Sequence, residues 1–247
     1  MKPNPIKFNP PKPTEKRFQS GIYNYCDRWC ERCPDTDKCF LFAKEEQRKA
    51  EHIAKGEDIN DPEIMWKDIE DSFKETHQLL NKAMKERGIT QEDLEQTAME
   101  IEEEKEPDFQ SHPLVKITTK YLKTTHQFLN EFYFEQQKIA DQFSVEISMD
   151  DIKDEIETIS WYHTMLATKT WRLLYEIHTT SVEKDGELKE IMEADIPKFF
   201  ALVNKCISKS QDAVASFNKK RKMQPERVKK MLELLGQVKV GVAKLDK

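Results

Sequence analysis

Residues 152–177 read IKDEIETISWYHTMLATKTWRLLYEI, and this stretch decides the fold class. Its apolar and weakly polar residues recur every three or four positions, which is the period of an α-helix. The members of this stripe are Ile152, Ile156, Ile159, His163, Leu166, Thr170, Leu173 and Ile177. Two further stripes of the same period run through residues 188–217 and 228–245. No segment shows a sustained two-residue alternation of Val, Ile and aromatic residues, so we predict essentially no sheet.

The composition also favours long helices. The 247 residues include only six glycines, and 35% of them are charged. Nucleotide-binding α/β folds and β-sandwiches need glycine for phosphate loops and tight turns, so this composition argues against both classes. We therefore predict an all-α fold in which residues 41–247 form an elongated, up-down bundle of several helices.

Helix start and stop signals predict where the helices lie. Asp61-Pro62-Glu63 combines a cap, a first-turn proline and an acid, while Gly56 and Gly88 are typical helix ends. The predicted helices cover residues 37–55, 61–87, 90–105, 113–143, 148–181, 187–220 and 225–245.

Residues 1–20 form a separate region. They hold five of the eleven prolines, with five bases and one acid, which predicts a disordered or extended basic arm. The arm has no apolar core typical of a secretion signal, and no stretch of the chain approaches the ~20 apolar residues of a membrane helix. We therefore expect a cytoplasmic protein. Its net charge of −6 argues against a nucleic-acid partner and leaves a protein partner as the expectation.

Residues 21–40 contain four of the five cysteines, namely Cys26, Cys30, Cys33 and Cys39. In a reducing compartment such a cluster indicates metal binding before it indicates disulfides. Four thiolates complete a tetrahedral zinc shell and leave no open position. The sequence therefore predicts an N-terminal metal knuckle with structural Zn²⁺.

An iron–sulfur cluster is the alternative for the same ligands. The spacing Cys-x3-Cys-x2-Cys is similar to that by which radical S-adenosylmethionine enzymes bind a [4Fe–4S] cluster. Those enzymes also need a large α/β barrel and a glycine-rich strand, and we predict neither here. The remaining cysteine, Cys206, lies on a helical stripe and is expected to be a small buried hydrophobe.

Three histidines fall on apolar stripes and form a possible second site: His77, His126 and His163. No histidine has an acid three residues before it, as a carboxylate-bridged di-iron bundle requires. Hydrogen-bonded core histidines are the simpler interpretation.

The sequence contains neither a Gly-x-Ser-x-Gly elbow nor a Walker-type loop. Our first hypothesis is a non-enzymatic interaction or scaffold protein whose zinc docks the N-terminal segment onto the bundle. The second is a metalloenzyme or redox protein, with its cofactor at the cysteines or at histidines inside the bundle.

Overall fold

The structure is a computed structural model that describes residues 12, 15–96, 107–144, 148–183, 186–222 and 224–246. Regular structure in these ranges is entirely helical, which confirms the all-α prediction. The chain divides into two compact units. Unit 1 comprises Met1–Tyr23 and Cys30–Pro107, and unit 2 comprises Asn24–Trp29 and Asp108–Lys247. Within the described ranges, no helix has the length and apolar character needed to cross a membrane. Most of the predicted basic arm lies outside the described residues.

The described part of unit 1 contains short 3₁₀ turns, the helices α1 and α2, and a helical stretch at 91–96. Its elements are η1 (Ile22–Tyr25, shared with unit 2), η2 (Cys30–Arg32), η3 (Thr36–Lys38), α1 (Phe40–Lys55) and α2 (Pro62–Arg87). The carboxylate of Asp61 caps α2 by accepting a hydrogen bond from the amide of Glu63 at 2.9 Å. Gly56 and Gly88 end the two helices at φ 75° and 69°, a conformation that glycine adopts without strain.

In unit 1, the start of α1 differs from the prediction, and the predicted helix at 90–105 lies only partly within the described residues. The helix α1 begins at Phe40 rather than near residue 37, because residues 36–38 form a separate 3₁₀ turn and Cys39 is extended. Of the predicted helix at 90–105, residues 91–96 are helical and the rest lies outside the described residues.

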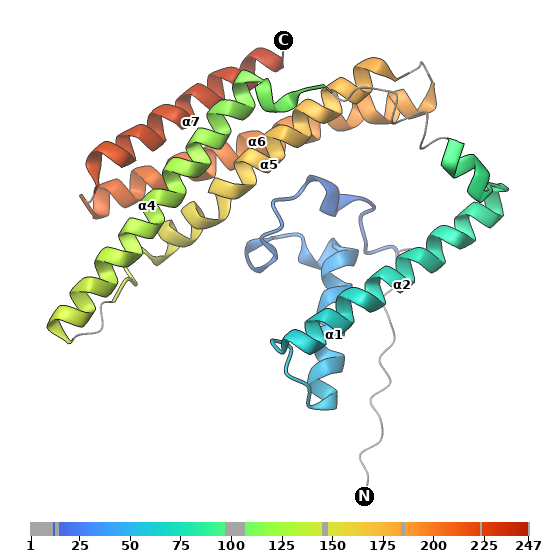
Figure 1. Cartoon of the computed structure of the whole chain (residues 1–247), viewed down its shortest axis with the longest axis horizontal. Coiled ribbons are helices and arrows are strands. Elements are labelled where there is room, and N and C mark those ends of the chain that lie inside the picture. The colour runs from blue at the N-terminus through green and yellow to red at the C-terminus, as the bar shows by residue number, and fades with distance from the viewer. Residues whose placement is uncertain are drawn as a thin grey trace, which may run out of the picture. The chain divides into compact units, whose positions relative to one another are not determined.

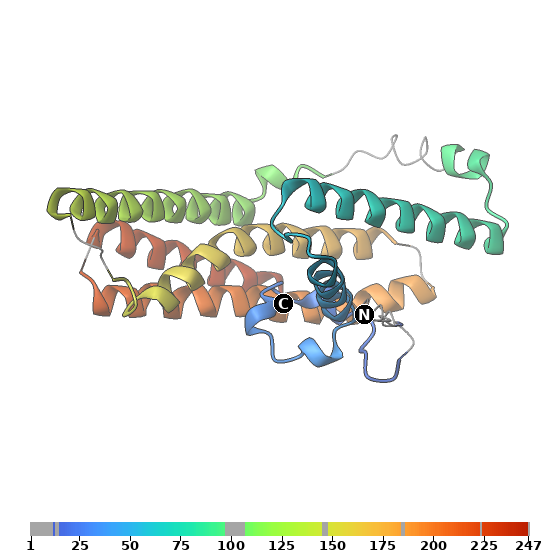
Figure 2. The same cartoon turned by 90° about the horizontal axis from the view of Figure 1, so that it is seen from below.

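Unit 2 is built around a four-helix bundle. Its elements are η4 (Phe109–Ser111), α4 (Pro113–Phe143), α5 (Lys153–Val182), α6 (Glu187–Lys220) and α7 (Pro225–Leu245). The helix α4 packs against α5 and α7, and α6 packs against the same two helices (Figures 1 and 2). The helices therefore follow one another around the bundle in chain order, as short connections favour.

The core of unit 2 follows the predicted stripes on α5, α6 and α7, and α4 contributes a further buried face. The largest fully buried side chains of this core include Tyr121, Phe128, Phe132, Leu166, Phe217 and Met231. The stripe predicted at 188–217 is buried from Phe199 onward, whereas Leu188 at its start remains 57% exposed. The amphipathic pattern thus identified the faces that form the core, and it overestimated how far along α6 the core extends.

Candidate functional site

The four clustered cysteines lie on the short turns that precede α1. Cys26 belongs to unit 2, while Cys30, Cys33 and Cys39 belong to unit 1. Cys39 is the N-cap of α1, and its Sγ accepts a hydrogen bond from the amide of Phe42 at 3.5 Å. The four side chains are partly buried, and none is in a disulfide. Among the residues that the structure describes, no three His, Cys, Asp or Glu side chains are arranged to hold a metal ion. The predicted knuckle is therefore not seen, and its metal stays a prediction.

The segment 24–29 packs on α5 and α6 through a buried carboxylate that sequence reasoning did not identify. Asp27 is only 5% exposed and accepts hydrogen bonds from the Tyr162 hydroxyl and, at 2.8 Å, from Nζ of Lys205. Its backbone carbonyl accepts a third bond from the indole N–H of Trp161 at 2.8 Å. The ring of Trp29 stacks on Trp161 with centroids 5.2 Å apart. We call these five residues the Asp27 cluster.

The electrostatics of the Asp27 cluster favour the ionised carboxylate. Burial by itself raises the pKa of Asp27, but the hydrogen bonds from Lys205 and Tyr162 and the lysine charge outweigh burial and lower it. Nearby, the hydroxyl of Tyr25 donates to Asp195, and burial together with this contact raises the pKa of Tyr25 to about 12. Tyr25 therefore stays a neutral hydrogen-bond donor. Two carboxylates accept the hydrogen bonds that hold the segment 24–29: its own Asp27, and Asp195 on α6.

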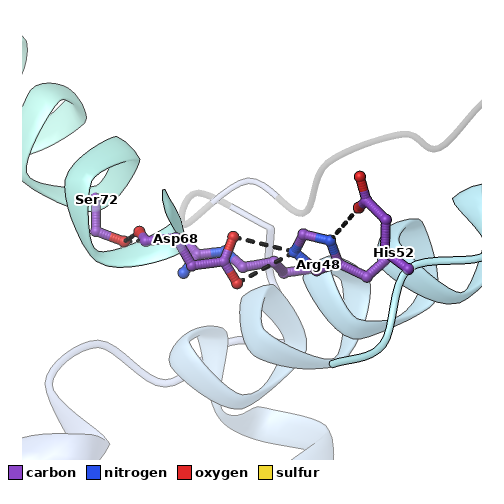
Figure 3. A network of polar contacts seen from close by, with 5 residues as sticks. Arg48, His52, Asp68 and Ser72 are labelled. Carbon is purple, nitrogen blue, oxygen red and sulfur yellow. Dashed lines mark hydrogen bonds and ion pairs between the residues drawn. The ribbon is translucent and has the colours of Figure 1, made fainter. Parts of the chain in front are cut away.

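Unit 1 contains a second polar network, which joins its two helices (Figure 3). His52 of α1 is 7% exposed, and its Nδ1 lies 2.6 Å from Oε2 of Glu57. Its Nε2 lies 3.0 and 3.1 Å from the two carboxylate oxygens of Asp68 on α2. Arg48, one turn earlier on α1, donates to the hydroxyl of Ser72 at 3.1 Å. We call this group the His52 network.

The charge state of His52 follows from its two acidic neighbours. The bond to Glu57 and then the bond and charge of Asp68 raise the pKa of His52 despite the cost of burying the ring. Both ring nitrogens are engaged by carboxylates, so neither is available as a catalytic base or a metal ligand in this arrangement. The network is an ionic link between the end of α1, the turn after it and α2.

The structure brings two of the three predicted histidines together. The rings of His126 on α4 and His163 on α5 are nearly parallel, with centroids 6.3 Å apart. Nδ1 of His163 donates to the carbonyl of Ser160 at 2.7 Å, and burial lowers the pKa of His163. His77 lies on α2 in unit 1, where it pairs with Asn81 at 3.1 Å. Of these three histidines, His163 is buried and hydrogen-bonded, whereas His77 and His126 are exposed. The interpretation as hydrogen-bonded core histidines therefore fits His163 and does not fit the other two.

A groove of about 690 Å³ lies between α4 and α5 in unit 2. Lys116, Lys120 and Lys123 line one wall, and Trp171 lies on the other. The described residues that line it include no histidine, cysteine or carboxylate.

The helix α2 has a large apolar surface that the described residues of unit 1 leave uncovered. None of its 26 residues is buried. Trp66 and Phe73 are 70% and 72% exposed, and Ile69 and Leu80 are also exposed. These four residues, spaced by three, four and seven positions, lie along one side of the helix and are called the α2 stripe below. The sequence already carried this signal as helical periodicity, but periodicity alone does not distinguish a core face from an exposed one.

Comparisons with models of protein families, with curated proteins and with solved structures find no match. The function of the chain is therefore argued from its own residues.

Proposed function

We propose that this protein is a non-enzymatic interaction or scaffold module that binds a protein partner through the α2 stripe. The observation that carries the proposal is the exposure of Trp66 and Phe73 on a helix without any buried residue. A contiguous exposed apolar surface that includes large aromatic residues is typical of docking surfaces. In such surfaces a few residues, often tryptophan, tyrosine or arginine, supply much of the binding energy.

The arrangement of polar groups supports the same interpretation. The strongly engaged titratable groups, Asp27 and His52, are each paired with opposite charges inside their own unit. Such pairs stabilise tertiary contacts, and they occupy Asp27 and His52 in structural roles. The His52 network also fixes α2 against α1, and a rigid helix loses less entropy on binding than a mobile one.

Photo-crosslinking in cells that express the full chain tests this proposal. Benzoyl-phenylalanine in place of Phe73 is expected to give specific protein adducts that Trp66→Glu abolishes. The matched control is the same substitution at Phe134, which is 69% exposed on α4 of unit 2. The absence of adducts at Phe73, or equal yields at both positions, would contradict the proposal.

We further propose that Cys26, Cys30, Cys33 and Cys39 bind one structural Zn²⁺ in a reducing, cytoplasmic environment. The support is their spacing within fourteen residues and the position of Cys39 at the first turn of α1, where the helix dipole favours a thiolate. Structural zinc contributes directly to folding, so the ion would order the turns between residues 21 and 40.

Elemental analysis of protein purified without oxygen tests the metal and separates it from the [4Fe–4S] alternative. One colourless zinc per chain is expected, and Cys30→Ser should lose it and make residues 21–40 more sensitive to protease. Cys206→Ala is the control, because Cys206 is buried in unit 2, and it should keep its zinc. Brown protein with iron and sulfide would favour the iron–sulfur alternative, and a metal-free wild type would contradict both.

A further inference from the structure

We infer that the partner of the α2 stripe is a second copy of this chain, and that the two α2 helices pair antiparallel. This inference rests on the proposed function and specifies its partner. Three features of α2 carry it: which side α1 occupies, how the apolar residues are spaced, and how charge and side-chain volume are distributed along the helix.

The polar contacts of α1 lie on a different side of α2 from the centre of the stripe, and Arg48 of α1 reaches the edge of the stripe, where it lines a shallow hollow with Ile69 and Phe73. Three polar contacts define that side: His52 with Asp68 at 3.0 Å, Arg48 with Ser72 at 3.1 Å, and Lys44 with Glu75 at 2.5 Å. Residues 68, 72 and 75 share one helical side, and at 100° per residue the α2 stripe lies roughly 100° or more around the helix from it. A second helix can therefore approach the stripe while α1 stays in place.

The stripe has the spacing of a coiled-coil seam. Alternating steps of three and four residues lead from Trp66 to Ala83, and this set consists of Trp66, Ile69, Phe73, Thr76, Leu80 and Ala83. Such a 3–4 repeat keeps one seam facing a neighbouring helix over several turns. The glutamate and histidine at residues 70 and 77 flank the seam.

Side-chain volume selects the antiparallel arrangement. When the seam pairs with its own reversed copy, Trp66 lies opposite Ala83, Ile69 opposite Leu80, and Phe73 opposite Thr76 of the second copy. Each layer then contains either one large and one small residue or two residues of equal size. Such layers fill a core without overpacking. A parallel pair would instead place tryptophan on tryptophan and alanine on alanine, so the Trp66 layer would be crowded and the Ala83 layer underfilled.

Charge favours the same orientation. Residues 62–73 carry four acids and one base, whereas residues 74–87 carry four bases and two acids. An antiparallel pair places each acidic half against a basic half, while a parallel pair places like charges together. At 70% and 72% exposure, two tryptophans and two phenylalanines can remove on the order of 400–700 Å² from water. Ile69 and Leu80 of both copies add to this area, which places the interface at the small end of the range for specific association, below ~1,200 Å².

Sedimentation equilibrium of the full chain from about 1 to 100 μM tests the inference. We expect twice the mass of one chain at the upper concentrations. Phe73→Glu should raise the dimer dissociation constant by about tenfold or more, because a charge would be buried in the seam. Phe134→Glu, an equally exposed aromatic in unit 2, should leave it unchanged. A monomer at every concentration, or a dimer insensitive to Phe73→Glu, would overturn the inference.

A residue exchange within one layer tests the antiparallel register. Ala83→Trp alone should weaken the dimer about tenfold, because two tryptophans would then meet in one layer. The exchange variant Trp66→Ala/Ala83→Trp restores one large and one small residue per layer and should recover most of that loss. Failure to recover would overturn the antiparallel register.

These results remain separable from the proposed function. A monomeric chain that still forms specific adducts at position 73 overturns the inference about the second copy and leaves the docking role of α2 standing. A monomeric chain without adducts removes both.

Discussion

Replacing Asp27 with alanine is expected to destabilise unit 2 by about 2–3 kcal/mol. The largest loss is the hydrogen bond from the buried hydroxyl of Tyr162, since a bond to a charged group contributes about 1.5–3 kcal/mol. The ion pair with Lys205 adds only about 0.5 kcal/mol, because the lysine side chain is 47% exposed and can return to water.

Urea unfolding followed by circular dichroism measures this loss directly. For a unit of this size, 2–3 kcal/mol corresponds to a fall in Tm of roughly 4–12 °C. Asp151→Ala is the matched control within unit 2, because that carboxylate pairs with Arg221 on the surface and should cost under ~0.5 kcal/mol. Equal effects of Asp27→Ala and Asp151→Ala would refute the assignment of Asp27 as the main polar attachment of residues 24–29.

The pH dependence provides a second readout of the same carboxylate. The pKa of Asp27 is lowered on folding, so its stabilising contribution is fully present above the unfolded pKa of about 3.9 and is lost as pH falls through the lower folded pKa. The wild type should therefore lose more stability than Asp27→Asn on acidification below about pH 4. Parallel curves for the two proteins would contradict the lowered pKa.

Three further outcomes follow from single sites. Folding raises the pKa of His52. The ionic contacts of His52 with Glu57 and Asp68 should therefore be complete below the unfolded pKa of about 6.5 and be lost as pH rises through the folded pKa. The protection of α1 amides against exchange, taken relative to the intrinsic rate at each pH, should fall over that range in the wild type and stay constant in His52→Gln. Burial raises the pKa of Cys206 to about 12, so at pH ~8 this thiol should resist alkylation until the bundle unfolds. Gly236→Ala should stabilise α7 by about 1 kcal/mol in thermal melts, since the added Cβ meets no atom within 4 Å. Gly241→Ala should gain less, because its Cβ would lie 2.6 Å from Leu114 Cδ1.

Local signals made most helix boundaries predictable. The ends of α6 and α7 agree with the predicted 187–220 and 225–245, and Gly56 and Gly88 end α1 and α2 as expected. These signals act within one turn of the residue that carries them, so a sequence alone contains them fully. The start of α5 differs by five residues from the predicted 148, because residues 149–152 form a turn before the helix begins.

The polar contacts that hold each unit together were not predictable in the same way. Asp27 meets Tyr162 across 135 positions of sequence, and His52 meets Asp68 across 16. His52 also reaches Glu57 at five positions, beyond the three or four that a continuous helix allows, because the left-handed turn at Gly56 reverses the chain. The sequence offers no local signal that pairs a single aspartate with a lysine 178 positions away.

The proposed zinc and the Asp27 cluster act on the same segment, and their energies are expected to be coupled. Cys26 directly precedes Asp27, so a metal bound at Cys26 and Cys30 would order the residues that present Asp27 to α5 and α6. Asp27→Ala should then cost less in the Cys30→Ser background, where the ordered segment is already lost, with a coupling of about 0.5–3 kcal/mol. A double-mutant cycle of these two substitutions, measured by urea unfolding with and without a chelator, determines the coupling free energy between them. If the two losses in unfolding free energy are strictly additive in metal-replete protein, residues 24–29 are held by the Asp27 cluster alone. The cysteines would then play no part in docking this segment.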